Sequence, residues 1–208
     1  MPDNSYYTAP LSKNQILTLY ANLAPLHFPA DELRPMENME SLFAREGYEG
    51  LGLYHTAAPD KLLGYALFIH VPKLPIVLLD FYAILEEYRC LGLGSTFLQQ
   101  IKIHYQNIRG ILLETEDVAA ASSPEEKLLR ERRNSFYEKN GAGKTSLSST
   151  VFGVAYSIYF LPTQTATTSV SKLLSKTSHT DFFYEALEKI YRFMLPDKLY
   201  QHVSISKH

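Results

Sequence analysis

The chain has 208 residues, of which 46% are apolar and 20% are charged, and its formal net charge is -2. This length suits one well-buried domain with an appendage at most, because domains usually contain roughly 100–200 residues. Charges of both signs are interspersed and the one basic run, RERR at residues 130–133, is short, so we predict no nucleic-acid-binding surface.

The first part of the chain predicts two helices followed by three strands. Apolar residues keep helical spacing over residues 14–26, where two prolines end the run, and a second helix is predicted over residues 36–45. Strands are predicted at residues 50–55, 62–71 and 76–85, separated by the turn-forming sequences AAPDK and PKLP. The simplest arrangement of these strands is an antiparallel meander.

The next part predicts a helix, a strand, a second helix and two strands, at residues 95–107, 110–116, 124–140, 144–150 and 151–162. Ser122 or Ser123 can cap the helix at 124–140, and Pro124 suits its first position. Gly141 ends that helix in a left-handed conformation. The complete order predicts an α/β fold with a mixed sheet.

The C-terminal part differs in composition from the rest. Residues 163–180 are rich in Ser and Thr and predict a polar connection. Residues 181–195 predict an amphipathic helix, whose apolar face carries Phe183, Leu187, Ile190 and Met194. We therefore divide the chain into a main domain, residues 1–162, and a C-terminal part, residues 163–208, whose helix packs on the same domain or on a partner.

A glycine-containing loop, EEYRCLGLGSTF at residues 86–97, lies between a predicted strand and a predicted helix. The first N–H groups of a helix have no internal partner, and the helix dipole favours an anion there. Gly92 and Gly94 let the backbone wrap such an anion, and Arg89 adds a positive charge. We predict a phosphate group at this loop, with a plain glycine-rich turn as the alternative.

Two nucleotide-binding motifs do not fit. The loop lacks the third glycine of a dinucleotide fingerprint. GAGKTS at residues 141–146 resembles the end of a P-loop, but the first glycine of that motif would fall at Glu138, inside a helix, and Lys144 precedes a strand. We therefore predict neither motif.

Two segments in order resemble the GNAT superfamily of N-acetyltransferases. YAILEEYRCLGLGSTFL resembles its acyl-CoA-binding motif, Q/R-x-x-G-x-G/A, and ILLETE followed by RRNSFYEKNGA resembles its next strand and the end of its next helix. The resemblance runs from about residue 50 to residue 161, and FPADELRP resembles a segment of one bacterial branch. Ala142 and Asn134 depart from the pattern, which usually has a phenylalanine and an apolar residue there. The resemblance implies an α/β fold with a mixed, mostly antiparallel central sheet flanked by helices, to which this chain adds a C-terminal helix.

The resemblance also implies acetyl-CoA as the acyl donor, with its pyrophosphate on the loop and its pantetheine arm along the preceding strand. The implied cofactor-binding residues are Arg89, Cys90, Leu91, Gly92, Leu93, Gly94, Ser95 and Thr96 in the loop, and Ala83, Ile84 and Leu85 at the strand end. The Ile84 amide is the candidate donor to the thioester carbonyl. Tyr137 matches the catalytic tyrosine of the family and is the predicted acid for the departing thiolate. The alternative is an aromatic ring that packs beside Phe136.

Two carboxylates follow the apolar part of the strand at residues 110–116. Glu114 and Glu116 lie two residues apart and so on one face of the strand. We predict Glu114 as the base that takes a proton from the amine, directly or through water, and Glu116 as a substrate ligand. Solvated charges at a strand end are the alternative. The seven histidines show no metal-ligand spacing, so no metal is predicted.

The cellular compartment is predicted from absent signals. Cys90 is the single cysteine, which excludes an intrachain disulfide and favours a reducing compartment. The sequence MPDNSYYTAPLSK has no basic region followed by an apolar run, so we predict no signal peptide, and no stretch approaches the ~20 apolar residues of a membrane helix. We therefore predict a cytoplasmic protein without a membrane partner.

The function predicted from these features is N-acetyl transfer from acetyl-CoA to a primary amine, by direct attack in a ternary complex. The acceptor would be a small-molecule or peptide amine. Two alternatives stay open: a non-catalytic acyl-CoA-binding regulatory protein, and an interaction module whose partner surface is the C-terminal helix. Whether the chain forms a homodimer is also open.

Overall fold

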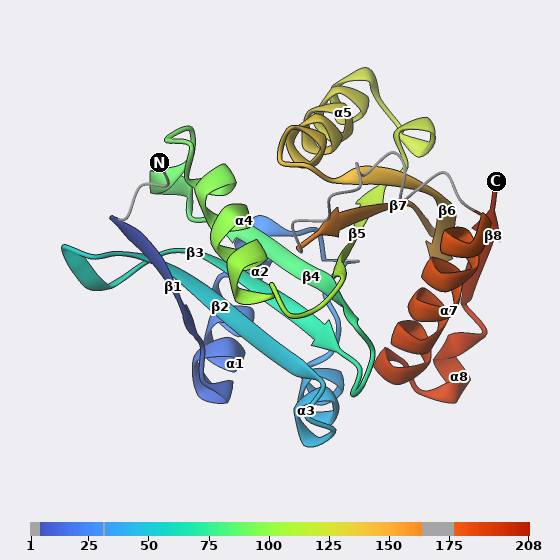
Figure 1. The fold of residues 1–208 in the computed structure, drawn as a ribbon, viewed down its shortest axis with the longest axis horizontal. Helices are drawn as coiled ribbons and strands as arrows, with labels where there is room; N and C mark the ends of the chain where they lie inside the picture. The colour runs from blue at the N-terminus through green and yellow to red at the C-terminus, as the bar shows by residue number, and fades with distance from the viewer. Residues whose placement is uncertain (1–4, 31, 164–176) are drawn as a thin grey trace. The chain divides into compact units, whose positions relative to one another are not determined.

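A computed structural model of the chain describes residues 5–30, 32–163 and 177–208 (Figure 1). It confirms the α/β class, with a mixed, mostly antiparallel sheet and flanking helices. The elements are β1 (Tyr6–Pro10), α1 (Lys13–Asn22), α2 (Ala24–His27), α3 (Met36–Ala44), β2 (Tyr48–His55), β3 (Ala58–His70), β4 (Ile76–Ile84), the 3-10 helix η1 (Glu86–Tyr88), α4 (Leu93–His104), β5 (Gly110–Glu116), the 3-10 helix η2 (Val118–Ala120), α5 (Pro124–Lys139), β6 (Gly143–Val151), β7 (Val154–Pro162), α7 (Thr177–Met194), α8 (Asp197–Tyr200) and β8 (Val203–Lys207).

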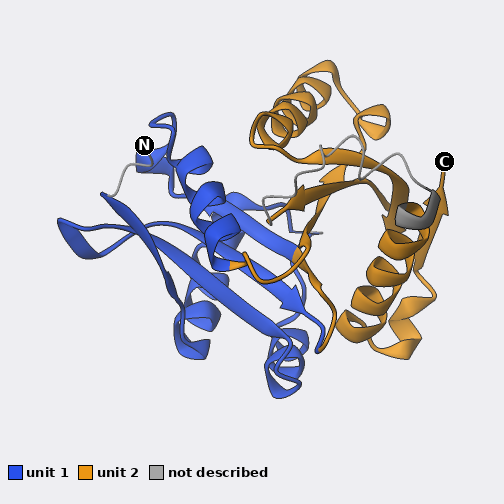
Figure 2. Ribbon diagram, in the orientation of Figure 1, with its two compact units in different colours: residues 1–72, 79–104 blue, residues 73–78, 105–208 orange. Residues whose placement is uncertain are grey.

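The chain forms two compact units (Figure 2). Unit 1 comprises residues 1–72 and 79–104, and unit 2 comprises residues 73–78 and 105–208. The strands of unit 1 follow the order β1-β2-β3-β4. Those of unit 2 follow the order β5-β7-β6-β8. A domain boundary at residue 162 stays a prediction, and most of the polar connection expected before α7 lies outside the described residues.

The first predicted helix is two helices in the structure. Ser12 caps α1 in a capping box, in which its Oγ accepts from the Gln15 N–H and the Gln15 side chain accepts from the Ser12 N–H. The helix ends at Asn22 rather than continuing to residue 26. Pro25 has no N–H, and its ring would meet the carbonyl of residue 21 if α1 continued, so the chain starts α2 instead.

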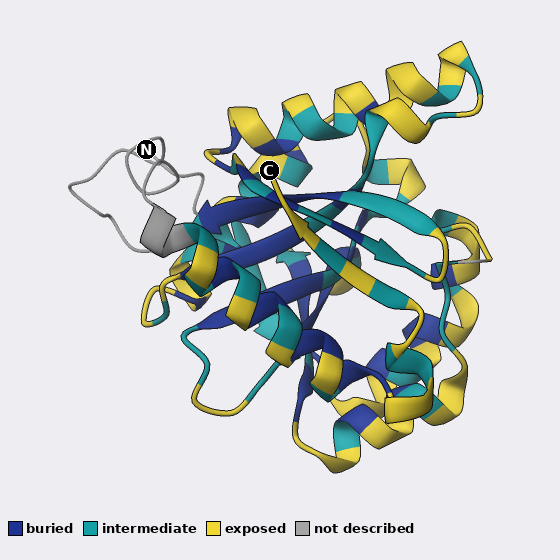
Figure 3. Ribbon diagram, turned by 90° about the vertical axis from the view of Figure 1, so that its right-hand side faces the viewer, coloured by how far each residue is buried: buried dark blue, intermediate teal, exposed yellow. Residues whose placement is uncertain are grey.

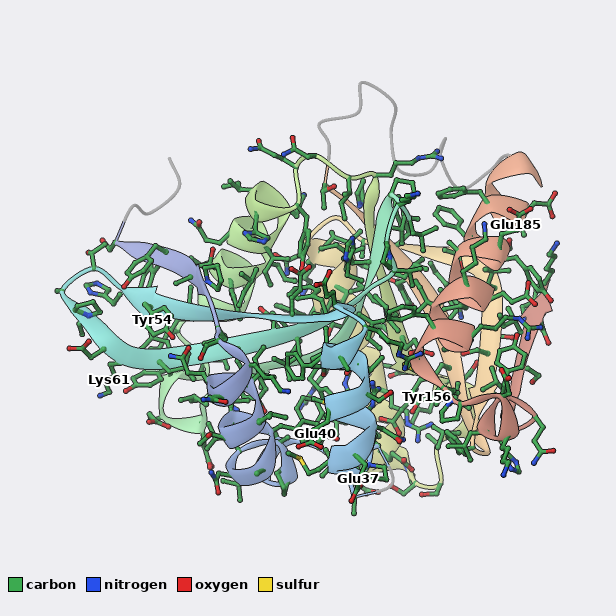
Figure 4. All side chains as sticks on the ribbon, turned by 90° about the horizontal axis from the view of Figure 1, so that it is seen from below. Glu37, Glu40, Tyr54, Lys61, Tyr156 and Glu185 are labelled. Carbon is green, nitrogen blue, oxygen red and sulfur yellow. The ribbon has the colours of Figure 1, made fainter. Side chains whose placement is uncertain are left out.

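The hairpin of β2 and β3 is antiparallel, as predicted, but its turn is shorter than the expected AAPDK. His55 pairs with Ala58, which leaves a two-residue turn, and Tyr54 pairs with Leu62 (Figure 4 labels Tyr54 and Lys61 near this end). The register shift leaves residues 59–61 outside the ladder. A proline can therefore lie within β3, because no ladder hydrogen bond needs its missing N–H.

A buried ion pair fixes the segment before α3 on the middle of β4. The Asp80 carboxylate accepts hydrogen bonds from Arg34 Nη2 and from Tyr48 Oη, both at 2.5 Å. Burial and the negative charge of Asp80 raise the pKa of Tyr48 well above its usual value. The Arg34 guanidinium also lies 5.8 Å from the centre of the Phe81 ring. These contacts tie the segment before α3 to Asp80 and Phe81 of β4.

Unit 2 is built on antiparallel pairs of β5 with β7, β7 with β6, and β6 with β8. Phe152 and Gly153, at φ 49° and 89°, make the tight turn between β6 and β7. Helices cover both faces, because Tyr159 contacts Glu138 of α5 and the next residue, Phe160, packs on Phe183 of α7. The predicted apolar face of α7 is buried, including Phe183, Leu187, Ile190 and Met194.

The predicted ends of α5 are confirmed. Ser123 is the N-cap, its Oγ accepting from the Glu126 N–H at 3.1 Å, and Pro124 is the first helical residue. Gly141 follows the C-cap Asn140 with φ 94°.

Among the described residues, the sequence did not predict the strands β1 and β8, the helix α8 or the 3-10 helices η1 and η2. β1 pairs with β2, and β8 pairs with the outer side of β6. β8 carries half-buried and exposed residues (Figure 3), so it lacks the apolar content by which the other strands were found. In the part of the chain that the structure describes, no helix has the length and apolar character needed to cross a membrane.

Candidate active site

The loop between β4 and α4 belongs to unit 1. α4 begins at Leu93, two residues earlier than predicted. Cys90 and Gly92 both have positive φ, 63° and 77°, on either side of Leu91. Such alternation turns successive N–H groups toward one point, which is the conformation of anion-binding backbone nests. A Cβ at Gly92 would meet no atom within 4 Å, so glycine is needed there for its conformation rather than for space.

The loop presents a row of unpaired amides. Among the described residues, the N–H groups of residues 90–95 form no hydrogen bond to another residue, and Thr96 is the first to donate, to Gly92 O at 3.3 Å. Tyr82 Oη donates to Gly94 O at 2.6 Å, and its ring stacks on Phe97 at 5.4 Å. The first turn of α4 is therefore held by β4 while its donors stay available. This arrangement suits an anion such as a phosphate group.

The end of β4 orients the candidate oxyanion donor. The Leu85 N–H donates to Leu63 O of β3 at 2.9 Å. Because N–H groups alternate in direction along a strand, the Ile84 N–H points away from β3. Arg89 Nε donates to Ile84 O at 3.2 Å, which ties the phosphate loop to the strand end. The predicted cofactor-binding residues of the strand and of the loop are thus brought together within unit 1.

Gly64 of β3 sets the position of the β4 end. A Cβ at Gly64 would lie 2.7 Å from Ala83 O and 3.3 Å from Ile84 Cα, both backbone atoms. We expect Gly64→Ala to displace Ala83 and Ile84 and to weaken kcat/KM for acetyl-CoA between about 10- and 100-fold, since small misplacements of reacting groups are costly. Steady-state kinetics with varied acetyl-CoA measure this effect.

Gly52→Ala of β2 is the matched control for Gly64→Ala. Its Cβ would also make contacts under 3.0 Å, but with side-chain atoms of Tyr54 and Leu62 rather than with backbone. We expect Gly52→Ala to leave kcat/KM for acetyl-CoA within about twofold. Equal losses in both variants would mean that Gly64 has no special relation to the donor site.

Tyr137 lies near the C-terminal end of α5, in unit 2. Its side chain is buried, and its ring contacts Phe136 edge-on at 5.3 Å. Burial raises the pKa of Tyr137 to about 12, although the positive charge of Arg133 opposes this shift. The phenol therefore keeps its proton at neutral pH, as a general acid must.

The two carboxylates of β5 have separate partners. Glu114 Oε1 accepts hydrogen bonds from Tyr191 of α7 and from Ser149 of β6. Glu116 forms ion pairs with Arg130 at 2.7 Å and with Arg133 at 3.0 Å, both on α5. The structure therefore ties Glu114 to the C-terminal helix α7 and Glu116 to α5. The two carboxylates do not converge on one position where a substrate could bind both. A base role for Glu114 and a ligand role for Glu116 stay predictions.

Two tyrosines near the predicted site residues were not found from the sequence. Tyr191 is fully buried, and its negatively charged neighbour Glu114, after the larger effect of burial, raises its pKa well above the usual value. Tyr82 holds the start of α4. Tyr191 lies outside both matched segments. Tyr82 is the first residue of YAILEEYRCLGLGSTFL, but the sequence did not show that its hydroxyl reaches Gly94. Within the described residues, no group of three or more His, Cys, Asp or Glu is placed to hold a metal ion.

The class of this α/β protein follows from comparison with known proteins. The sequence profile of the acetyltransferase (GNAT) family matches residues 16–141, more than half of the chain. The chain therefore belongs to the GNAT acetyltransferase family, whose members are acyltransferases that use acetyl-CoA. A search of curated proteins gives no match.

Solved structures share the fold at low sequence identity. A GNAT-family protein from Bacteroides thetaiotaomicron is 15% identical, with a TM-score of 0.63 over 91% of this chain and 99% of that one. The ribosomal-protein-S18-alanine N-acetyltransferase of Escherichia coli is 18% identical, with a TM-score of 0.53 over 77% and 96%. Spermidine N-acetyltransferase of Vibrio cholerae, solved with CoA and spermine, is 12% identical, with a TM-score of 0.53 over 83% and 100%. At these identities the similarity shows the fold alone.

Proposed function

We propose that the protein transfers the acetyl group of acetyl-CoA to a primary amine by direct attack in a ternary complex. The observation that carries the proposal is the row of N–H groups at residues 90–95, which form no hydrogen bond within the described part of the chain and lie in the loop whose sequence resembles the family's acyl-CoA-binding motif. Acetyl-CoA supplies an activated thioester, and the chain's own residues bind it and move the protons.

Each step has a candidate group. The amides of residues 90–95 and the Arg89 charge bind the pyrophosphate. The Ile84 N–H stabilises the oxyanion that forms on the acetyl oxygen when the amine attacks the carbonyl carbon, a contribution of about 2.7–4 kcal/mol for one such donor. Tyr137 gives its phenolic proton to the departing thiolate. With its pKa raised to about 12, the phenol keeps its proton until the C–S bond breaks, but it is a weaker acid than the thiol that forms, so the transfer is uphill unless burial also raises the basicity of the thiolate.

An amine acceptor is supported by the relatives of similar fold, one of which acts on the alanine of ribosomal protein S18 and another on spermidine. The two acceptors, a protein alanine and spermidine, are both amines but differ in size. They therefore support the reaction type and leave the size of this protein's acceptor open. The cytoplasmic location and the absence of a nucleic-acid partner stay predictions, and whether the chain forms a homodimer stays open.

The test is release of CoA thiol from acetyl-CoA in the presence of a panel of amines, consisting of spermidine, a peptide with a free N-terminal alanine, a lysine peptide and an amino sugar. We expect thiol release that depends on one amine class, with the acetylated amine identified by mass spectrometry. Tight acetyl-CoA binding without acetylation of any of these amines would favour the non-catalytic acyl-CoA-binding protein.

A further inference from the structure

His27 and Tyr65 form a hydrogen-bonded pair in unit 1. His27 is the last residue of α2, and Tyr65 is a fully buried residue of β3. Nδ1 of His27 lies 2.9 Å from Oη of Tyr65, and the two rings are 5.7 Å apart with an interplanar angle of 30°. His27 itself is half-buried. Its imidazole is thus held by a buried phenol while part of the ring is accessible.

The pair lies next to the end of β4. Leu63, two residues before Tyr65, accepts the hydrogen bond from the Leu85 N–H. Gly64, between them, comes close to Ala83 O and to Ile84 on its own face, so Tyr65 occupies the opposite face. Neighbouring strands are only about 4.8 Å apart. The Tyr65 backbone therefore lies on the strand next to the stretch proposed to hold the thioester, and the imidazole lies at the tip of the Tyr65 side chain, over that face of the sheet.

The two faces of β4 carry different elements of unit 1. Tyr82 contacts α4, through Gly94 and Phe97. Phe81, on the other face, packs on Tyr20 of α1 at 5.4 Å and on Phe28, the residue after His27, at 4.8 Å. The phosphate loop thus leads into the helix on one face, and His27 lies with the N-terminal helices on the other. An acceptor that approaches from the face of the N-terminal helices meets His27.

Charged groups of the β4–α4 connection act electrostatically on His27, in addition to its hydrogen bond with Tyr65. Burial and the positive charge of Arg89 lower the pKa of His27 below its usual 6.5, whereas Glu86 and Glu87 act in the opposite direction. Burial also raises the pKa of Tyr65 strongly, so the phenol stays neutral. At neutral pH the imidazole is therefore unprotonated and able to accept a proton.

We infer that His27 is the general base that takes the proton from the attacking amine, and that Tyr65 is its positioning residue; this inference rests on the proposed acetyl transfer. In the reactive tautomer, Nδ1–H donates to Tyr65 Oη and the lone pair of Nε2 faces the amine. The amine proton moves to Nε2 as the C–N bond forms, the C–S bond breaks, and Tyr137 protonates the thiolate. Water then takes the proton from the imidazolium and returns one to the Tyr137 phenolate, so the protein is restored.

This assignment differs from the sequence-based choice of Glu114. The Glu114 carboxylate already accepts hydrogen bonds from Tyr191 and Ser149, which join α7 and β6. His27 has its hydrogen bond on Nδ1, so its second ring nitrogen can serve an amine. Variants of the two residues separate the hypotheses.

The test measures kcat/KM against pH, with acetyl-CoA and the amine of the panel that gives the highest turnover. We expect wild-type activity to fall as the pH drops, with a midpoint below 6.5, because protonated His27 cannot accept a proton.

His27→Gln should lower kcat/KM at neutral pH about 10²- to 10⁴-fold and abolish this acidic limb of the pH profile. Glu114→Gln should keep the limb, and Tyr65→Phe should lower kcat while the limb persists. His70→Gln, at the end of β3, is the control and should behave as wild type.

Two further readouts separate catalysis from folding. Added imidazole should restore activity to His27→Ala, which a structural defect would not allow. The His27 ring, followed by NMR in the protein without substrates, should titrate with the same midpoint as the acidic limb, because kcat/KM reports groups of the free enzyme.

Unchanged kinetics in His27→Gln, or a limb that disappears in Glu114→Gln instead, would overturn the inference while the acetyltransferase stands. A wild-type protein that acetylates no amine would instead refute the proposed function. That outcome would remove the inference as well, because the inference rests on acetyl transfer. Where the protein does acetylate an amine, a His27 titration midpoint above 6.5 would contradict the lowered pKa that the base role requires.

Discussion

Gly92→Glu abolishes acetyl-CoA binding at concentrations that saturate the wild-type protein. The new carboxylate would lie within the row of amides that is proposed to hold the pyrophosphate. Two like charges about 4 Å apart repel by about 4 kcal/mol at an effective dielectric of 20, which corresponds to about a thousandfold in affinity. Isothermal titration calorimetry of wild type and variant measures the difference.

The matched control for Gly92→Glu is Gly153→Glu, in the turn between β6 and β7. Both glycines have positive φ, 77° and 89°, and a Cβ at either would meet nothing within 4 Å. Both substitutions therefore cost similar backbone strain, about 1–2 kcal/mol. We expect Gly153→Glu to bind acetyl-CoA normally. Binding lost in both variants would indicate strain, and binding kept in both would show that the pyrophosphate lies elsewhere.

The parts of the fold that the sequence predicted are those with local signals. Ser123, Pro124 and Gly141 mark the ends of α5 by their own conformational preferences, and apolar runs mark β4, β5 and β7. The loop of residues 90–95 was found for the same reason, because its glycines lie between a strand and a helix. Local chemistry decides such features, so no knowledge of distant segments is needed.

The features that the sequence did not predict depend on contacts between distant segments. β1 and β8 are short strands without a long apolar run, and their pairing partners, not their composition, make them strands. The hydrogen bond of Tyr191 to Glu114 spans 77 residues, and that of His27 to Tyr65 spans 38. No spacing rule identifies such pairs. Each pair nevertheless changes the catalytic role that can be assigned to Glu114 or to His27.

The effect of these contacts on the site differs between the two carboxylates. Spacing correctly places Glu114 and Glu116 on one strand, but their partners come from α7 and α5, which cover opposite faces of the sheet of unit 2. A carboxylate whose charge is balanced by Arg130 and Arg133 attracts a cationic amine less than an isolated one would. Burial and pairing thus decide which predicted acids remain available for substrate.

Tyr137→Phe lowers kcat about 10²- to 10⁴-fold and leaves acetyl-CoA affinity unchanged. The substitution removes the phenolic proton while the ring keeps its buried position beside Phe136. With a pKa raised to about 12, Tyr137 stays protonated below pH 11, so its ionisation produces no alkaline loss of wild-type activity in the usual assay range. Pre-steady-state measurement of thiol release, with calorimetry of donor binding, separates chemistry from binding.

Tyr159→Phe is the matched control for Tyr137→Phe. Burial likewise raises the pKa of Tyr159 to about 12, and its hydroxyl donates to Glu138 of the same helix that carries Tyr137. If a high-pKa phenol on this side of unit 2 were enough, both variants would lose turnover equally. We expect only Tyr137→Phe to lose it, because the family pattern assigns proton donation to that position. A Tyr137→Phe variant with wild-type kcat would leave the thiolate to be protonated by water and would confine Tyr137 to packing.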